Sequence, residues 1–330
     1  MSELDAMARA IELSRLGLGR TYPNPIVGAV ILSPTGEVIG EGFHQGSDHA
    51  EVIAINNATN IPLGSILFCT LEPCNHVGLT PACTDAIINA GISKVVFAVT
   101  DPNPIAKGGE AAMRGAGIDV TSGLMSDEAA EANRDWLTKI VKARPRFTWK
   151  IASTLDGKIA AKDATSKWIT SEAARSDVTI LRSQADAILT GTGTVLADNP
   201  SLTCRGAGLD PVRIVMGVRE IPGEFAVHSN NARTIFIKSR DITELLALMS
   251  VEGFNRVLIE SGPTLGTALL KAGLIDEVIL YQAPTFLGSG TSSISDLGIS
   301  TLTERMDFEI KSVEKVGPDI KTVMYLKGGN

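Results

Sequence analysis

Cysteine is scarce in this sequence, which has four in 330 residues. Small secreted domains depend on many disulfides, whereas cytosolic chains use a few cysteines for metal binding or packing. Residues 1–20 contain no apolar core of the kind found in a signal peptide, and no run of eighteen apolar residues occurs. We therefore expect a cytoplasmic protein that neither crosses a membrane nor relies on disulfides.

Positive charge and aromatic side chains are also in short supply. The formal net charge is −7, and aromatic residues make up 5% of the chain. A protein that binds along a nucleic-acid strand needs a basic path with aromatic side chains on which bases stack, so we expect no nucleic-acid partner. Hydrophobic residues at 44% and charged residues at 20% are typical of folded soluble proteins. At about 150 residues per domain, the length favours two domains.

Three potential zinc ligands and a carboxylate stand in the first third of the chain. They are His49, Glu51, Cys74 and Cys83, in the segments His49-Ala50-Glu51, Pro73-Cys74 and Pro81-Ala82-Cys83. One imidazole and two thiolates hold zinc and leave a fourth position for water, whose pKa the metal lowers to about 7. Glu51 suits the transfer of protons from that water to the substrate ring and the leaving amine. The pattern predicts a hydrolytic deaminase with Glu51 as its catalytic residue.

The spacing of these residues and two nearby histidines leave several points open. Eight residues separate the two cysteines, whereas the usual pattern is Pro-Cys-x-x-Cys. His76 is an alternative fourth ligand, which would make the site a closed structural one. Local sequence leaves open whether His44 is a solvated loop residue or part of a pocket. Residues two apart do not share a helix face, so we expect Glu51 to reach the site of His49 from the first helical turn.

Apolar periodicity predicts alternating helices and strands along the whole chain. In the first half we expect helices from Ser2 to about Gly17 and at 49–58, 81–90 and 126–143, and strands at 27–32, 38–42, 65–70 and 94–100. A new unit begins after Arg144-Pro145-Arg146, and its expected strands are 147–151, 187–190, 212–216, 234–238, 256–260, 277–282 and 322–326. Both units are predicted to be α/β, with domains at 1–145 and 146–330.

Two glycine-rich turns follow predicted strands in the second half, Gly191-Thr192-Gly193-Thr194 and Gly262-Pro263-Thr264-Leu265-Gly266. Such a turn at the start of a helix lets backbone amides approach a phosphate. Neither turn has the Gly-x-Gly-x-x-Gly spacing of a Rossmann dinucleotide-binding domain. On spacing alone, a tight turn and a phosphate site are equally good interpretations.

Longer motifs occur in both halves. They are residues 21–28 (TYPNPIVG), 49–51 (HAE), 71–76 (LEPCNH), 80–83 (TPAC), 101–104 (DPNP), 155–158 (LDGK), 166–170 (SKWIT), 193–203 (GTVLADNPSLT) and 260–265 (ESGPTL). In this order they resemble the bifunctional riboflavin-biosynthesis deaminase-reductases, and the resemblance covers nearly the whole chain.

The resemblance implies an N-terminal three-layer α/β/α domain similar to cytidine deaminases and a C-terminal α/β domain similar to dihydrofolate reductase. The first would use zinc to hydrolyse the ring 2-amino group of 2,5-diamino-6-ribosylamino-4(3H)-pyrimidinone 5′-phosphate. The second would use NADPH to reduce the ribosyl group of 5-amino-6-(5-phosphoribosylamino)uracil to a ribityl chain. The family also suggests a homodimer or larger assembly built through the C-terminal domain.

By position, the resemblance implies roles for further residues. The base and ribose pocket of the deaminase would be shaped by Asn24, His44, His76, Asp101 and Asn103. Substrate contacts in the reductase would come from Ser166, Arg182, Leu202, Arg205 and Glu260. Cofactor contacts would come from Ala152, Trp168, Thr194, Asp198 and the loop Gly262, Pro263, Thr264, Leu265, Gly266, Thr267 and Ala268. Arginine suits a phosphate because its planar fork donates two parallel hydrogen bonds.

Two positions depart from the family pattern. Leu79 stands where a basic residue usually follows His-x-Gly, and Lys107 is a candidate replacement as a phosphate partner. Gly217-Val218 stands where an Asp-Ser pair commonly follows a strand. A side-chain contact to the adenosine end of the cofactor is then missing, which leaves the preference for NADPH over NADH open.

Two other functions compete with this interpretation. A tRNA or DNA-base deaminase with a nucleotide-binding C-terminal module would share the zinc site, but it would need basic and aromatic residues along the strand path. A non-enzymatic protein, with zinc as a staple and the second half as a nucleotide sensor, would bind zinc and NADPH without turnover.

Overall fold

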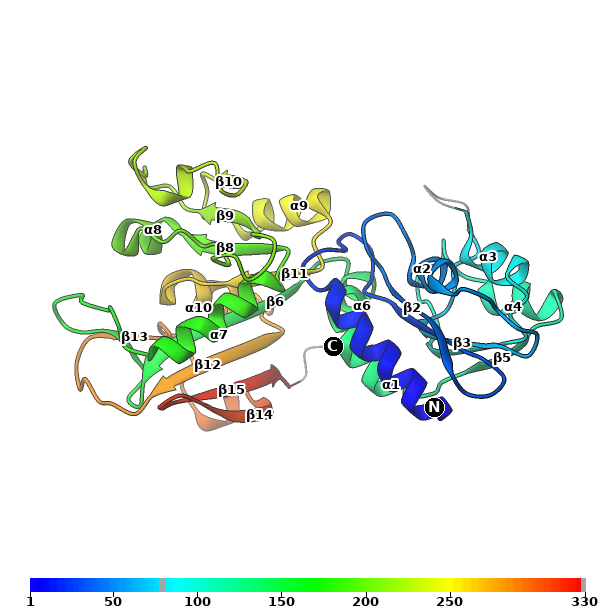
Figure 1. The fold of residues 1–330 in the computed structure, drawn as a ribbon. Coiled ribbons are helices and arrows are strands. Elements are labelled where there is room, and N and C mark those ends of the chain that lie inside the picture. Colours follow the sequence, from blue (N-terminus) through cyan, green and yellow to red (C-terminus); the bar gives the residue numbers. More distant parts are fainter. Residues whose placement is uncertain (77–80, 328–330) are drawn as a thin grey trace. The chain divides into compact units, whose positions relative to one another are not determined.

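A computed structural model of the chain describes residues 1–76 and 81–327. The chain divides into two compact units, Met1–Ala143 and Arg144–Asn330. Each unit is an α/β structure built around its own sheet (Figure 1). Across the described ranges, no helix combines the length and the apolar character needed to traverse a lipid bilayer.

The first unit contains a five-stranded sheet in the order β2-β1-β3-β4-β5. β2 and β3 run antiparallel to β1, and β4 and β5 continue parallel to β3. The strands are β1 (Gly28–Leu32), β2 (Val38–Phe43), β3 (Ile66–Leu71), β4 (Lys94–Val99) and β5 (Asp119–Ser122). The helices are α1 (Glu3–Ser14), η1 (Arg15–Gly17), α2 (Ala50–Asn57), α3 (Cys83–Asn89), α4 (Gly109–Gly115), α5 (Ser126–Ala132) and α6 (Arg134–Lys142).

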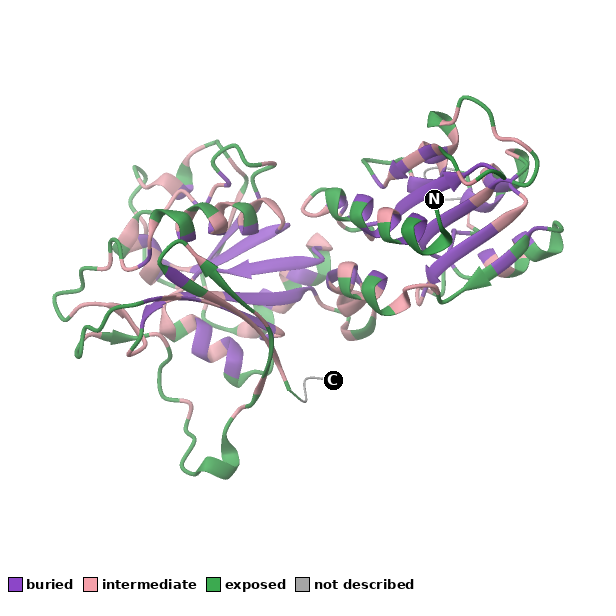
Figure 2. Ribbon diagram, turned by 60° about the horizontal axis from the view of Figure 1, so that its bottom comes forward, coloured by how far each residue is buried: buried purple, intermediate pink, exposed green. Residues whose placement is uncertain are grey.

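Two hydrophobic cores lie on opposite faces of this sheet, because successive strand residues point to opposite sides. Val30 and Phe68 pack in a core with residues of α1 and α5. Ala29 and Leu67 pack in the other core with residues of α2, α3, α4 and α6. Helices therefore cover both faces, which is the predicted three-layer arrangement, and Figure 2 shows the buried strands flanked by half-exposed helices.

The close packing of α2 on β2 fixes the start of that helix on the sheet. A Cβ atom on Gly42 would collide with the carbonyl oxygen of Ala50, the first residue of α2. Only glycine leaves room for such a close approach of helix and strand backbones. The helix start carries His49 and Glu51, so this contact helps to set their position.

The second unit contains an eight-stranded sheet in the order β10-β9-β8-β11-β6-β12-β15-β14. The strands from β10 to β12 in this order are parallel, and β15 and β14 are antiparallel to their neighbours. The strands of this sheet are β6 (Arg146–Thr154), β8 (Ala187–Gly191), β9 (Val212–Met216), β10 (Thr234–Ile237), β11 (Arg256–Ile259), β12 (Glu277–Ala283), β14 (Phe308–Val316) and β15 (Asp319–Leu326). β7 (Lys158–Ala160) and β13 (Thr291–Ser292) form a separate two-stranded antiparallel sheet. The helices are α7 (Glu172–Ser183), α8 (Thr192–Asp198), η2 (Ala226–His228), α9 (Ile242–Glu252), α10 (Pro263–Lys271) and η3 (Leu302–Glu304).

The helix predicted over 126–143 is wrong, because the structure has two helices there, α5 and α6. Asn133 separates them with φ −99° and ψ 15°. Its buried side chain accepts a hydrogen bond from the backbone N–H of Ile26, at 3.2 Å. The sequence pattern also does not predict β5 or β14. β5 buries only Val120, and most of β14 is exposed, so neither strand shows an alternating apolar pattern.

Candidate functional sites

Three potential metal ligands meet at the carboxyl end of β3. His49 is the residue before α2, Cys83 is the first residue of α3, and Cys74 follows β3. Nδ1 of His49 lies 3.0 Å from Sγ of Cys83 and 3.5 Å from Sγ of Cys74. With Zn–S near 2.3 Å and Zn–N near 2.0–2.1 Å, tetrahedral geometry places nitrogen and sulfur about 3.5 Å apart. The donor set and its spacing fit zinc. Within residues 1–76 and 81–327, these three are the only group found that could hold a metal.

The two cysteines share a hydrogen bond that shifts the pKa values of their thiols in opposite directions. The Cys83 thiol, and then the His49 ring, lower the pKa of the Cys74 thiol to about 4, against the opposing effect of burial. The backbone N–H of Cys83 also donates to Sγ of Cys74, at 3.5 Å. The same hydrogen bond raises the pKa of the Cys83 thiol, so the pair favours a single thiolate, on Cys74, and the thiolate is the form that binds metals.

Glu51 is buried in the first turn of α2, with 3% of its surface exposed. Burial raises the pKa of its carboxyl group, which interacts with His49 and with the Cys83 thiol. His49 itself has extended backbone angles, φ −78° and ψ 151°, because it precedes the helix. The rule that residues two apart diverge on a helix therefore does not apply, and both side chains reach the same site.

The other predicted deaminase residues lie in different surroundings. His44 is buried, with its ring centroid 5.2 Å from that of His49, so it is not a solvated loop residue. Burial, and then the charge of His49, lower the pKa of His44 to about 4. Asp101 is buried and accepts a hydrogen bond from the backbone N–H of Asn103, at 2.8 Å. His76 is half-buried and Asn24 is exposed. Leu79 lies outside the described residues.

Sequence reasoning assigned no role to Glu72, which organises the loops around this site. Its buried carboxylate accepts hydrogen bonds from the backbone N–H groups of Asp101, at 3.2 Å, and Glu110, at 3.0 Å. It thereby ties the segments after β4 and at the start of α4 to the segment that carries Cys74. The sequence signal for this role was the position of Glu72, a charged residue between the apolar strand 66–71 and Pro73.

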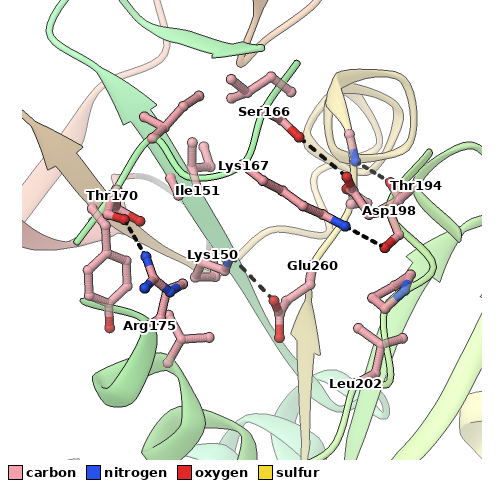
Figure 3. A pocket seen from close by; sticks show the side chains of 18 of the residues that line it. Lys150, Ile151, Ser166, Lys167, Thr170, Arg175, Thr194, Asp198, Leu202 and Glu260 are labelled. Carbon is pink, nitrogen blue, oxygen red and sulfur yellow. Dashed lines mark hydrogen bonds and ion pairs between the residues drawn. The ribbon is translucent and has the colours of Figure 1, made fainter. Parts of the chain in front are cut away.

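A cavity of about 480 Å³ opens in the second unit (Figure 3). This volume is within the range of small-molecule sites. Ten predicted site residues line it: Ala152, Ser166, Trp168, Arg182, Thr194, Asp198, Leu202, Arg205, Glu260 and Gly262. Trp168 is 64% exposed at the cavity wall, Trp136 is buried in a hydrophobic core, and Trp149 is buried with part of its ring at the cavity.

The prediction that residues 262–268 form a loop is wrong, because most of this segment is helical. Gly262 precedes α10, and residues from Pro263 onward are helical and do not line the cavity. Gly266 lies against the ring of Trp149, with which an added Cβ atom would collide. Thr267 is buried and accepts a hydrogen bond from the backbone N–H of Ser295, at 2.9 Å. Gly266 is therefore explained by helix–strand packing.

Glu260 is the centre of a buried charge cluster at the end of β11. It accepts two hydrogen bonds from Arg182, at 2.6 and 3.0 Å, and Nζ of Lys150 lies 3.3 Å away (Figure 3 shows the lysine). Burial alone would raise the pKa of Glu260, but the two cations outweigh it and hold the pKa at about 2. The remaining terminal nitrogen of Arg182 donates to the carbonyl of Thr203, at 3.1 Å. The guanidinium group of Arg182 therefore already donates its hydrogen bonds to oxygen atoms of the protein.

Sequence reasoning did not single out Lys150, although it is the one charged residue in the predicted strand 147–151. The cavity lining contains five basic side chains and two acidic ones, which gives it a net positive charge. The two glycine-rich turns also meet here, because Oγ1 of Thr194 accepts a hydrogen bond from the backbone N–H of Gly262, at 2.9 Å. A positive cavity at the carboxyl ends of parallel strands suits phosphorylated ligands.

Comparison with known proteins covers both units. The cytidine and deoxycytidylate deaminase zinc-binding region matches residues 1–99, and the RibD C-terminal domain matches residues 145–322. Riboflavin biosynthesis protein RibD of Mycobacterium tuberculosis (strain H37Rv) is 46% identical over 324 residues, covering 96% of this chain and 95% of that protein. RibD of Escherichia coli K12 is 40% identical over 355 residues, covering 95% and 96%. The crystal structure of a diaminohydroxyphosphoribosylaminopyrimidine deaminase/5-amino-6-(5-phosphoribosylamino)uracil reductase from Thermotoga maritima has a TM-score of 0.90 at 36% identity, with 98% of each chain covered.

Proposed function

The chain belongs to the family of bifunctional riboflavin-biosynthesis deaminase-reductases, and on this premise we propose which part of the molecule carries each reaction. We assign deamination to residues 1–145 and reduction to residues 146–330. The Thermotoga maritima relative is named for diaminohydroxyphosphoribosylaminopyrimidine and 5-amino-6-(5-phosphoribosylamino)uracil, and we propose the same substrates here. A tRNA or DNA-base deaminase would not account for the match to the RibD C-terminal domain.

In the deaminase unit, His49, Cys74 and Cys83 would hold one zinc ion, which supplies a water of pKa about 7 and Lewis acidity when bound. Glu51 would take one proton from water and pass it to the ring nitrogen, and would then take a second proton from the hydroxyl group added to the ring carbon and pass it to the amine, which departs as ammonia. The burial of Glu51, which favours its protonated form, suits a group that must give the proton up again. Asn24, His44, His76, Asp101 and Asn103 would orient the base and ribose.

In the reductase unit, NADPH would supply the hydride, and the chain's own residues place the reactants in the cavity. Ala152, Trp168, Thr194, Asp198 and Gly262 line it and are proposed cofactor contacts. Ser166, Leu202 and Glu260 are proposed substrate contacts. Arg205 is exposed and forms no ion pair within the described part of the chain, so its fork is available for the substrate phosphate. Arg182 is proposed to act on the substrate through its positive charge, since Glu260 occupies its fork.

The observation that carries the proposal is the meeting of His49, Cys74 and Cys83 beside the buried Glu51. The test supplies the phosphorylated diaminopyrimidine with and without NADPH, and follows ammonia and NADPH absorbance separately. Ammonia should appear in both arms, and NADPH should be consumed only after it. Absence of ammonia release would contradict the proposal.

A homo-oligomer, a dimer or larger, is also proposed, and sedimentation of the full chain tests it.

Replacing Cys83 with Ala should reduce the zinc content from about one ion per chain to near zero, because two protein ligands bind zinc far more weakly than three. Deamination should be lost with the metal. Elemental analysis of the dialysed protein measures the content. Cys69→Ala is the matched control, since Cys69 is also buried and free but lies in the core, and its zinc content should stay at the parental value.

Replacing Lys107 with Ala should raise the KM of the deaminase about tenfold with little change in kcat, if Lys107 binds the substrate phosphate. Lys107 is exposed in a segment that packs on the loop of Cys74, where the backbone N–H of Asn75 donates to the carbonyl of Ala106, at 3.3 Å. The control is Lys94→Ala, at the opposite, amino end of β4. An unchanged KM in Lys107→Ala would reject this role.

A further inference from the structure

Arg219 follows β9 by three residues, at the carboxyl end of that strand. The two residues between them, Gly217 and Val218, have no polar side chain. Arg219 is therefore the first side chain after β9 that can bind an anion. β9 is hydrogen-bonded to β8, which is hydrogen-bonded to β11, and β11 leads directly to Glu260 in the cavity.

The guanidinium of Arg219 lies over the backbone of Gly193, because a Cβ atom on Gly193 would collide with Nη2 of Arg219. Gly217 packs in the same way against the side chain of Thr192, which holds the end of β9 against the turn that opens α8. The next residue of that turn, Thr194, lines the cavity and accepts the hydrogen bond from Gly262. Arg219 thus lies against the turn whose next residue, Thr194, lines the cavity.

Arg219 is exposed, and within residues 1–76 and 81–327 it has no hydrogen bond or ion pair. Its fork is therefore open to a ligand. Three basic residues of the cavity lining are already engaged, since Lys150 and Arg182 pair with Glu260 and Lys167 donates to the carbonyl of Asp198. Arg205 is open, but it is the proposed contact of the substrate phosphate. Strand spacing of about 4.8 Å places β9 about 10 Å from β11, a separation that an extended dinucleotide can bridge.

We propose that Arg219 binds the 2′-phosphate of NADPH and gives the reductase its preference for NADPH over NADH. The inference rests on the proposed reductase function, in which residues of the cavity and of the two glycine-rich turns beside it would hold NADPH. A guanidinium donates two parallel hydrogen bonds to a phosphate dianion, and a ribose hydroxyl at the same place offers no such charge. Arg219 thereby distinguishes the two dinucleotides at the carboxyl end of β9, where Gly217 and Val218 have no polar side chain that could bind the phosphate.

The test measures the Kd of NADP⁺ and of NAD⁺ by calorimetry on the full-length protein, for the parent, Arg219→Ala and Arg219→Lys. Arg219→Ala should weaken NADP⁺ binding about 10- to 100-fold and change NAD⁺ binding less than about twofold. Arg219→Lys should lie between, because lysine keeps the charge but not the fork. Lys271→Ala, which removes an exposed cation at the far end of α10, should leave both Kd values unchanged.

Two outcomes would overturn the inference. If Arg219→Ala binds NADP⁺ as tightly as the parent, or loses affinity equally for both dinucleotides, Arg219 does not recognise the 2′-phosphate although the reductase function stands. If the parent binds neither dinucleotide, the proposed reductase function fails and this inference fails with it.

Discussion

Replacing Glu51 with Gln should slow ammonia release by about 10²- to 10⁴-fold, because glutamine has nearly the same shape but cannot carry a proton. Glu51 is buried in the first turn of α2 and touches the Cys83 thiol, so it is the carboxylate placed to serve the reacting groups. The measurement is the initial rate of ammonia formation from the phosphorylated diaminopyrimidine.

Two controls separate proton transfer from other roles of Glu51. The zinc content of Glu51→Gln should equal that of the parent, since Glu51 is not among the three metal ligands. NADPH consumption should also be unchanged when 5-amino-6-(5-phosphoribosylamino)uracil is supplied directly, because the reductase cavity lies in the other unit. A variant that deaminates at the parental rate would show that another group carries the proton, and the proposed deaminase mechanism would be wrong.

Replacing Glu260 with Gln should destabilise the second unit by about 3 kcal/mol, since it leaves Lys150 and Arg182 as neighbouring cations without their counter-charge. The depressed pKa of Glu260 supports this size, because each pKa unit corresponds to about 1.4 kcal/mol. At about 2–4 °C per kcal/mol, Tm should fall by roughly 10 °C. Reductase activity should fall about 100-fold, because Arg182 and Lys150 lose the group that positions them.

The pH dependence of this effect has a definite sign. Glu260 has a pKa of about 2 in the folded protein against an ordinary value of 4.5, so its charge stabilises the fold above pH 4.5. That contribution is lost as the pH falls from 4.5 towards 2. The difference in unfolding free energy between the parent and Glu260→Gln should therefore be constant from pH 5 to 8 and shrink below about 4.5.

Two further variants distinguish the charge cluster from a general effect of losing a carboxylate. Glu252→Gln removes a carboxylate whose partner, Arg233, has a side chain that is 58% exposed, and it should cost less than about 1 kcal/mol. Adding Lys150→Met to Glu260→Gln restores the parental net charge of the cluster and should recover much of the stability, but not the reductase activity. Equal destabilisation by Glu252→Gln and Glu260→Gln would rule out the proposed role of the cluster.

Much of this molecule could be predicted from local patterns. The His-x-Glu and Pro-Cys segments predicted the zinc type of deaminase, the longer motifs of both halves indicated the family, and the comparisons confirm both. Alternating apolar residues predicted the buried strands well because burial on a sheet imposes a period of two. The same reasoning failed for β14, which is mostly exposed, and for Asn133, whose hydrogen bond to Ile26 interrupts a helix that the local sequence would continue.

The chain's chemistry was set by residue types and spacings, since a metal-binding thiolate or a proton-carrying carboxylate is a property of a side chain and its near neighbours. Only the folded structure decided which groups are already engaged, because a hydrogen bond between residues far apart in sequence leaves no local pattern. Arg182 has its fork filled by Glu260, 78 positions away, and Arg219 remains open beside Gly193 because no acidic side chain of the described chain reaches it.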